Sequence, residues 1–406
     1  ATKTPIHYFT AYRYHTRGRE NMLSEWPFPQ ACRWIMRMTN PPGLCAMLGD
    51  ADLTPPPSDM FAAVADATRD GVFQAFYLEN SARPDNVYKN LTQQLLAFDP
   101  TIKPQSPEGV LPRGAILPAN TGCFSSRSDW NPDKTACVVY GKAGHGAEHH
   151  GHHDVGSVCI DGYTKRLIID LGSPAYPADF FGPNRWKYYT AGVAGHNVLM
   201  FDGTEMRKTQ DDKGRFTASE FDDARGGWWQ MDTSAMYDGV RRVVRTVVHL
   251  LPGIVVVLDE AQLDAKREIS LRWHTADRCE PTDDGAFTVA QEGVCLDSRV
   301  IRLGDLPIEI RRREHEYQAP FNRRRLGQLL EQRHESYIEA VTTDFRCQLV
   351  SVFYVSASGK PSPAWRWIDG RAEIDTPEGL VSVHSHPDRL EVGCGGVGWT
   401  ASTAGL

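Results

Sequence analysis

Residues 141–176 read GKAGHGAEHHGHHDVGSVCIDGYTKRLIIDLGSPAY, and this stretch indicates the fold. It contains two short apolar runs, 155–160 and 166–170, separated by the turn signal Asp161-Gly162. Short β-branched runs on either side of such a turn are typical of a β-hairpin. The same texture continues from about Gly109 onwards, as in HNVLMFDG, GIVVVLDEA, EISLRWHT and CQLVSVFYVS. Many short strands without intervening helices predict an antiparallel β-sandwich rather than a parallel sheet.

The first hundred residues have a helical pattern instead. Apolar residues recur at three- and four-residue spacing over 28–38, 60–70 and 86–98, with proline-rich breaks between these segments. A further proline-containing stretch, 104–112, marks the change of texture. We therefore expect an α+β multidomain chain with a helical segment over 1–103, a large antiparallel β-sandwich over 104–356 and a terminal β segment over 357–406.

The composition excludes several classes of function. The chain has 406 residues, of which 44 are basic and 51 acidic, and its net charge is -7. Sequence-independent nucleic-acid binding requires a basic excess, so we expect no nucleic-acid partner. No apolar run reaches the roughly 18 residues that span a bilayer, so we expect no membrane partner. Nine cysteines without a CxxC pair do not indicate a disulfide framework.

The histidines are strongly clustered. Five of the 14 fall within nine residues, namely His145, His149, His150, His152 and His153. A strand projects residues i and i+2 to the same face, so an extended segment would point His150, His152 and Asp154 the same way. A solvent-exposed polar loop or a surface metal scavenger is the alternative interpretation.

Two residues outside this cluster favour a functional site. Asp170 ends an apolar run, where a carboxylate is costly unless it is paired or bound to a metal, and the predicted hairpin sets it opposite roughly residues 152–155. His196 immediately precedes another apolar run. Two imidazoles and one carboxylate with an open fourth position form a common zinc site, so these residues predict a metal centre.

The same residues resemble a known family. The segments GHGAEHHGHHDVGSV (144–158), LIIDLGSPAY (167–176) and AGHNVLMFDG (194–203) are similar to the core signature of the heparinase II/III-like polysaccharide lyases, in the branch that includes oligoalginate lyases. Leu171 and Val198 stand where the family usually has Pro and Thr. Upstream, GLCAMLGDADLTPP (43–56) resembles the Gly-Asp loop of the family.

The resemblance implies a fold, an activity and a metal. It implies an incomplete α/α toroid joined to an antiparallel β-sandwich, and β-elimination on an acidic polysaccharide that contains uronic acid, either alginate or a glycosaminoglycan such as heparan sulfate, hyaluronan or chondroitin. His152, Asp170 and His196 would hold a zinc ion with a structural role, and His150 would face the substrate as a catalytic residue. The family carries a catalytic tyrosine on a toroid helix, for which Tyr8 is the best stand-in here.

Three residues ahead of His196 are candidates for substrate binding. Arg185 could meet a substrate carboxylate, and Tyr188 and Tyr189 could stack on sugar rings, although a loop packed on the sandwich is an equal alternative. His384 and His386 repeat the i, i+2 spacing, but no acid-capped partner strand accompanies them in the sequence. We therefore interpret these two as surface residues.

Two other functions remain open on the sequence alone. One is a zinc-dependent glycan hydrolase, in which the metal would activate water. The other is a non-catalytic carbohydrate-binding module. The chain begins ATKTPIHYF without the apolar core of a signal peptide, and a cleaved leader would leave the same start. We expect a periplasmic or secreted protein. A homodimer is left open.

Overall fold

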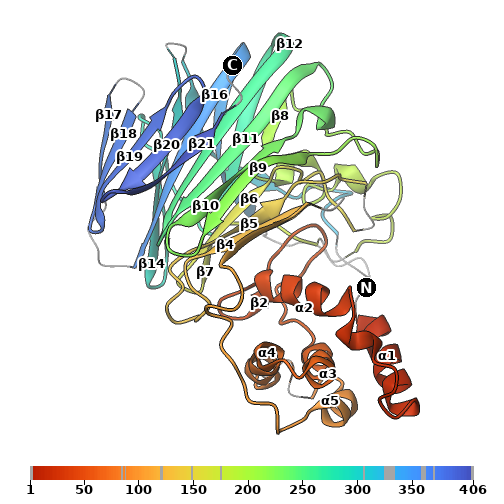
Figure 1. Ribbon diagram of the computed structural model, residues 1–406. Helices are drawn as coiled ribbons and strands as arrows, with labels where there is room; N and C mark the ends of the chain where they lie inside the picture. Colours follow the sequence, from red (N-terminus) through yellow and green to blue (C-terminus); the bar gives the residue numbers. More distant parts are fainter. Residues whose placement is uncertain are drawn as a thin grey trace. The chain divides into compact units, whose positions relative to one another are not determined.

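Two groups of residues form compact units in the structure, a computed structural model (Figure 1). The first unit contains Ala1–Ala46, Asp52–Pro112 and Trp130–Pro132. The second contains Met47–Ala51, Arg113–Asp129 and Asp133–Leu406. The structure describes residues 3–83, 86, 88–118, 122–147, 150–173, 176–304, 307–323, 334–357, 363–368 and 371–403.

The first unit is helical, as the sequence predicts. Its elements are α1 (Lys3–His15), η1 (Met22–Ser24), α2 (Phe28–Arg37), the strand pair β1 (Thr39–Asn40) and β2 (Leu44–Cys45), α3 (Ser58–Thr68), α4 (Gly71–Ser81) and α5 (Leu91–Ala97). Helix α3 is buried on nearly every face, and its Phe61 packs in one core with Phe73 of α4 and Cys32 of α2. Within the described ranges, no helix is long and apolar enough to cross a bilayer. That these helices belong to a toroid stays a prediction.

The second unit consists of three antiparallel sheets joined by loops. The first sheet runs in the order β3 (Gly114–Leu117), β4 (Cys123–Arg127), β5 (Val138–Lys142), β6 (Val158–Gly162) and β7 (Lys165–Ile168). The largest sheet runs in the order β13 (Ala286–Gln291), β14 (Val294–Arg302), β16 (His334–Ala357), β12 (Ile254–His274), β11 (Val240–Leu250), β10 (Gly226–Asp232) and β9 (Arg215–Asp222). In addition, β15 (Glu309–Glu316) pairs with β16, and β8 (Leu199–Phe201) pairs with β12. The third sheet runs in the order β17 (Ala364–Ile368), β18 (Arg371–Thr376), β19 (Gly379–Ser385), β20 (Arg389–Cys394) and β21 (Val397–Ser402).

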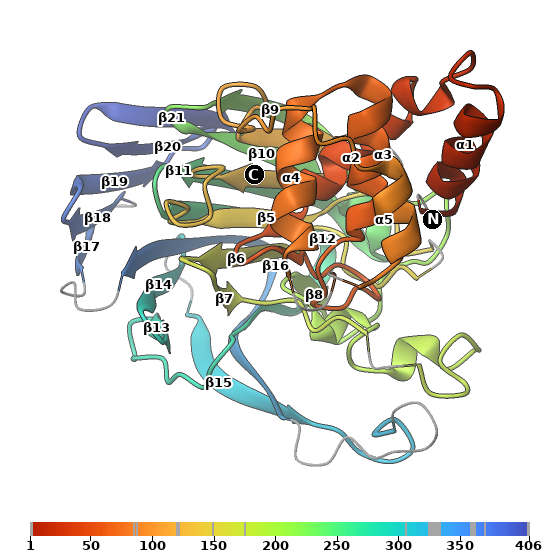
Figure 2. The same cartoon turned by 90° about the horizontal axis from the view of Figure 1, so that it is seen from below.

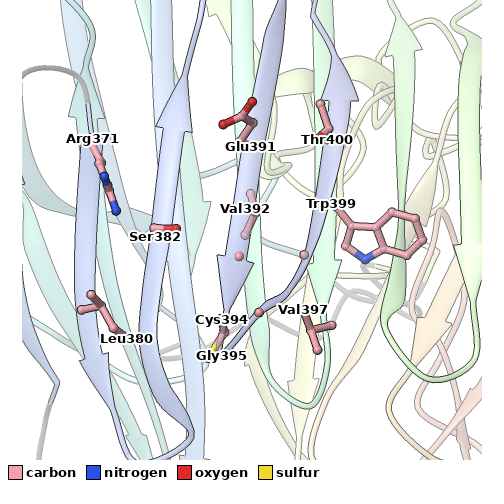
Figure 3. Close-up of a pocket in the computed structure, with 13 residues that line it drawn as sticks. Arg371, Leu380, Ser382, Glu391, Val392, Cys394, Gly395, Val397, Trp399 and Thr400 are labelled. Carbon is pink, nitrogen blue, oxygen red and sulfur yellow. The ribbon is translucent and has the colours of Figure 1, made fainter.

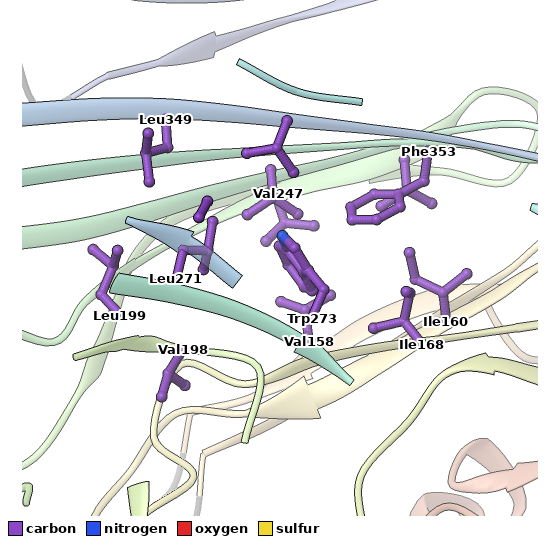
Figure 4. Packing of buried hydrophobic residues seen from close by; sticks show 14 of the residues in the cluster. Val158, Ile160, Ile168, Val198, Leu199, Val247, Leu271, Trp273, Leu349 and Phe353 are labelled. Atoms are coloured by element: carbon purple, nitrogen blue, oxygen red, sulfur yellow. The ribbon is translucent and has the colours of Figure 1, made fainter. Parts of the chain in front are cut away.

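The main core lies between the first and the largest sheet. Val158 of β6 and Ile168 of β7 belong to the same buried cluster as Val247 of β11, Trp273 of β12 and Phe353 of β16 (Figure 4). Successive residues of a strand face opposite sides of the sheet. This pair of sheets is therefore the antiparallel β-sandwich that the sequence predicts. The histidine segment leads directly into its β6–β7 hairpin.

A second core lies on the opposite face of the largest sheet. Val248 alternates with Val247 along β11, and it packs with Val256 and Val352 against residues of the third sheet such as Val383 and Val392. The second unit thus has three layers of sheet (Figure 2). The terminal β segment expected over residues 357–406 has strands β17–β21 in its described part, and these strands form a layer of the second compact unit.

Two local expectations from the sequence are wrong. Asp161 and Gly162 do not form the hairpin turn, because Gly162 pairs with Lys165 and the two-residue loop is Tyr163-Thr164. Both loop residues have positive φ angles, 44° and 73°, as the twist of a two-residue hairpin requires. Residues 150–154 are not a strand either, since they form an irregular loop in which His150 has a φ of 67°.

Candidate functional site

Three residues that are distant in sequence converge next to the β6–β7 hairpin. His152 lies in the loop before β6, Asp170 follows β7, and His196 follows the short helix η3 (Val193–Gly195). All three are fully buried. His196 Nδ1 hydrogen-bonds Asp170 Oδ2 at 2.8 Å, and the His152 and His196 rings lie 5.3 Å apart. One ligand atom from each residue lies within 4.8 Å of the others, so the structure brings the predicted metal set together.

The chemistry of this cluster fits a metal ion. Among the described residues, His152 Nδ1 and His196 Nε2 are shielded from solvent and have no hydrogen-bond partner. Such a buried nitrogen is costly unless it carries a ligand. Burial lowers the pKa of His152, which keeps the imidazole neutral as metal binding requires. Burial acts on His196 in the same direction, but the neighbouring Asp170 outweighs it and raises the pKa of His196.

A buried carboxylate, Asp50, organises the histidine loop. Its two oxygens accept hydrogen bonds from His152 Nε2 at 2.8 Å and from His150 Nδ1 at 2.9 Å, and both lie within 3.2 Å of Arg185 Nη2. Burial opposes the charge of Asp50, but these partners outweigh it and lower the pKa of the carboxyl group. Asp50 belongs to the Gly-Asp loop noted in the sequence, but no feature of the sequence around it indicates that this loop contacts the histidines.

Gly49 allows this approach. Its φ is 56°, and a Cβ at this position would lie 2.6 Å from the carbonyl oxygen of His150. Asp50 N also donates a hydrogen bond to that carbonyl at 3.1 Å. A side chain at position 49 would therefore push the two loops apart, which explains why the Gly-Asp pair occurs in this loop.

His150 differs from His152 because it is accessible. Its side chain is 46% exposed, whereas that of His152 is fully buried. Tyr176 Oη lies 3.2 Å from His150 Nδ1, and the ring of Phe181 meets the imidazole edge to face at 5.3 Å. Sequence reasoning named His150 but missed Tyr176, whose only signal was its place at the end of the LIIDLGSPAY segment. The pair combines an imidazole and a phenol, two groups that transfer protons in enzymes.

A chain of polar contacts extends behind the metal set. Asn197 Oδ1 accepts a hydrogen bond from His274 N at 2.7 Å, and Asn197 Nδ2 donates to the carbonyls of Val158 and Ile169, each at 3.0 Å. Tyr189 Oη lies 2.9 Å from His274 Nε2. Asn197 therefore ties the strand that follows His196 to the β6–β7 hairpin and to β12.

Two buried ion pairs fix the loops on either side. Arg245 of β11 pairs with Asp259 of β12 at 2.7 Å and donates to the carbonyl of Gly156 at 2.7 Å and to that of Asn197. Lys142 of β5 pairs with Asp154 at 3.1 Å, and both side chains are buried. Because Arg245 is hydrogen-bonded on several sides, it holds the Gly156 and Asn197 loops against the sandwich. The Lys142 ion pair ties Asp154 to β5.

The predicted substrate residues have different surroundings. The Arg185 guanidinium is buried, donates to the carbonyl of Gly151 at 2.8 Å and lies 4.2 Å from the Phe180 ring centroid, so in this structure it supports Asp50. Tyr188 is 2% exposed and packs on Phe180, which leaves no ring face for a sugar. For Arg185 and Tyr188, the structure therefore fits the alternative of a loop packed on the sandwich. The apolar rings around Arg185 exclude water from its ion pair with Asp50.

Tyr189 remains next to open space. Its ring stacks on His315 with centroids 3.6 Å apart, and both line a cavity of about 540 Å³ together with Lys187, Tyr317 and Tyr337. Burial raises the pKa of Tyr189 well above its usual value, so its phenol stays protonated. Tyr8, the predicted catalytic tyrosine, lies on α1 of the other compact unit and is 63% exposed. The catalytic role of Tyr8 stays a prediction.

Comparisons with known proteins found a matching family model and similar solved structures. The family model "Heparinase II/III-like, C-terminal" matches residues 128–348. A crystal structure of heparinase III is similar over 93% of this chain and 54% of its own, with 14% identity and a TM-score of 0.64. A heparan sulfate lyase from Pedobacter heparinus is similar over 90% of this chain and 51% of its own, with 16% identity and a TM-score of 0.63.

The matches cover most of this chain but only part of the solved structures. The chain spans about half the length of the solved structures that it matches, and the structural likeness at this identity concerns the fold. A search of curated proteins gave no match. The family model covers more than half of the chain, and its span includes every residue of the histidine loop, the Asp170 turn and the His196 turn. The chain therefore belongs to the heparinase II/III-like family.

Proposed function

We propose that the protein is a polysaccharide lyase that cleaves an acidic polysaccharide at its uronic acid residues by β-elimination. Alginate and the glycosaminoglycans heparan sulfate, hyaluronan and chondroitin are the candidate substrates. The observation that carries the proposal is the accessible His150, which is hydrogen-bonded to the buried Asp50 next to the His152, Asp170 and His196 set. Membership of the heparinase II/III-like family supports it.

The environment of His150 suits proton abstraction. An ionised carboxylate only accepts hydrogen bonds, so the contact with Asp50 assigns the proton to Nδ1 and the lone pair to Nε2. In the elimination, a base removes the proton on C5 of the uronate and its electrons form the C4=C5 double bond. The C4–O bond breaks, and the leaving oxygen takes up a proton. His150 is our candidate for the base, and the phenol of Tyr176 or of Tyr8 is our candidate for the acid.

The metal has a separate task in this proposal. A zinc ion bound by His152, Asp170 and His196 would supply a fixed positive charge that holds the histidine loop in position. The chain's own residues orient the base: Asp50 fixes the tautomer of His150, and the buried Arg185 neutralises Asp50. We therefore expect chelation mainly to lower the unfolding temperature of the protein, with little direct effect on the elimination reaction.

The test is an ultraviolet assay for the unsaturated product. The purified protein is incubated with each of the four polymers, and the absorbance of the C4=C5 uronate is followed. We expect turnover on at least one polymer and a decrease in kcat/KM of about 10²- to 10⁴-fold in His150→Ala. His334→Ala is the matched control, because His334 is an exposed strand histidine on β16 that is absent from the site.

Each alternative function predicts a different result. New reducing ends without ultraviolet absorbance, lost on chelation, would mean a metal-dependent hydrolase. Retention of a polymer without turnover, equal in wild type and His150→Ala, would mean a carbohydrate-binding module. Either result overturns the lyase proposal. Tyr176→Phe and Tyr8→Phe, assayed side by side, identify which phenol protonates the leaving oxygen.

A further inference from the structure

The hairpin between β19 and β20 carries a second group of metal-ligating side chains. Along β19, Val381 and Val383 face the core, so His384 lies on the opposite, outer face of the third sheet. His386 follows two positions later, just past the end of the strand. In the antiparallel register, His384 is directly opposite Glu391 of β20. The acidic partner that the sequence did not reveal thus comes from the neighbouring strand, on the far side of the turn.

The three side chains lie close together. One ligand atom from each of His384, His386 and Glu391 is within 4.8 Å of the others. The two imidazole rings have centroids 3.8 Å apart, and His386 Nε2 lies 3.3 Å from Glu391 Oε2. Despite this approach, His386 Nε2 is shielded from solvent and forms no hydrogen bond with any residue that the structure describes. A nitrogen in that state has a position that a ligand can fill.

We propose that His384, His386 and Glu391 bind a divalent transition-metal ion, with Zn²⁺ as the expected ion. Two imidazole nitrogens and one carboxylate oxygen suit this class of metal, and three protein ligands leave a fourth position for water. Backbone hydrogen bonds hold the turn in place: His386 N donates to the carbonyl of Arg389 at 2.8 Å, and Thr403 N donates to the carbonyl of Asp388 at 3.0 Å.

The surrounding charges permit a cation. Two arginines are near, but each has an acidic partner: Arg389 contacts Glu391 Oε1 at 2.7 Å and Asp388 at 3.1 Å, and Arg371 contacts Glu373 at 3.3 Å. The two positive charges are thus exceeded by the three carboxylates. Because Arg389 occupies Oε1 of Glu391, the other oxygen, Oε2, faces His386 and is the atom for the metal.

One of the three ligands, Glu391, borders a groove in the third sheet. Glu391 lines this groove of about 470 Å³ together with Arg371, Ser382 and Thr400 (Figure 3). The three ligands are only partly buried, whereas His152, Asp170 and His196 are completely buried. We therefore expect the hairpin ion to exchange with solution faster than an ion at the buried set, and to be removed first by a chelator.

Metal counting on the purified full-length chain tests the proposal. Each protein is stripped with a chelator, titrated with Zn²⁺ by calorimetry and analysed for bound zinc. We expect His386→Gln and Glu391→Gln each to lose one equivalent relative to wild type. The matched control is His334→Gln on β16, where the imidazole lies 3.9 Å from Glu316 but belongs to none of the three-residue groups found in the described chain.

The outcome does not depend on the proposed enzyme activity or on the buried set, since the variants leave His152, Asp170 and His196 unchanged. Circular dichroism and thermal unfolding verify that each variant is folded. Using two variants, one at the turn and one on β20, guards against a folding defect in one of them. If both folded variants bind as many equivalents of zinc as wild type and His334→Gln, with the same affinity, the hairpin site does not exist.

Discussion

At the scale of single residues, Asp50 connects three side chains of the site. It is the common partner of His150, His152 and Arg185, and it comes from a loop about a hundred positions earlier in the chain. The structure brings His152, Asp170 and His196 together as the sequence predicted, and their binding of a metal stays a prediction. Sequence reasoning gave Asp50 no role, because only the folded chain brings the Gly-Asp loop to the histidines.

This arrangement predicts a large effect of a small change. Asp50→Asn keeps the size of the side chain but leaves the buried Arg185 without a counter-charge, so we expect the free energy of unfolding to fall by about 3–5 kcal/mol. Urea unfolding measures this difference. Asp52→Asn, at an exposed position of the same loop, is the control and should change little. Equal values for the two variants would contradict the central role of Asp50.

At the scale of elements, strand β11 shows how one strand serves two cores. Val247 faces the main core and Val248 faces the second core, so β11 is buried on both faces over residues 243–250. His249 follows in the same strand and is completely buried. Its Nδ1 lies 2.8 Å from Ser126 Oγ of β4, which connects two sheets of the sandwich.

His249 predicts a specific dependence of stability on pH. Burial lowers the pKa of His249 from 6.5 to about 4. Between these values the unfolded chain binds more protons than the folded chain, so stability is complete above about pH 6.5 and is lost as the pH falls towards 4. The full loss is about 3 kcal/mol for one such histidine. His249→Gln should remove this part of the acid dependence.

The measurement is the free energy of unfolding in urea at several pH values between 4 and 7. We compare wild type, His249→Gln and the exposed-site variant His334→Gln, which should follow wild type. Parallel curves for all three proteins would show that His249 is protonated without cost in the folded state, contrary to its buried position.

At the scale of the whole molecule, the second unit depends on its third layer. From the sequence, residues 357–406 are expected only to form a terminal β segment. In the structure, Ile374, Val381, Val383 and Leu390 of that segment are buried in one cluster with residues of the largest sheet. The third sheet is therefore a cover for an apolar surface.

Removal of the third layer should destabilise everything that it covers. Each buried aliphatic side chain contributes about 1.5–3 kcal/mol, so loss of the whole layer approaches the roughly 5–15 kcal/mol that stabilises a typical domain. We expect a chain that ends at Ala357 to aggregate or to bind the dye ANS, with a lower unfolding midpoint. A chain that ends at Thr403 is the control. A truncated protein with the wild-type midpoint and no dye binding would show that the third layer does not stabilise the rest of the unit.

The sequence by itself determined the helical start of the chain, the antiparallel β-sandwich and the histidine motifs with their family resemblance. These features are local or periodic, so they can be recognised without knowing what lies next to them. Tertiary structure alone decided that Asp50 holds the histidine loop, that Tyr176 accompanies His150 and that Glu391 faces His384. The physical reason is that such contacts depend on strand register and loop approach across many residues. Those are fixed by burial of the shared cores, which no short stretch of sequence contains.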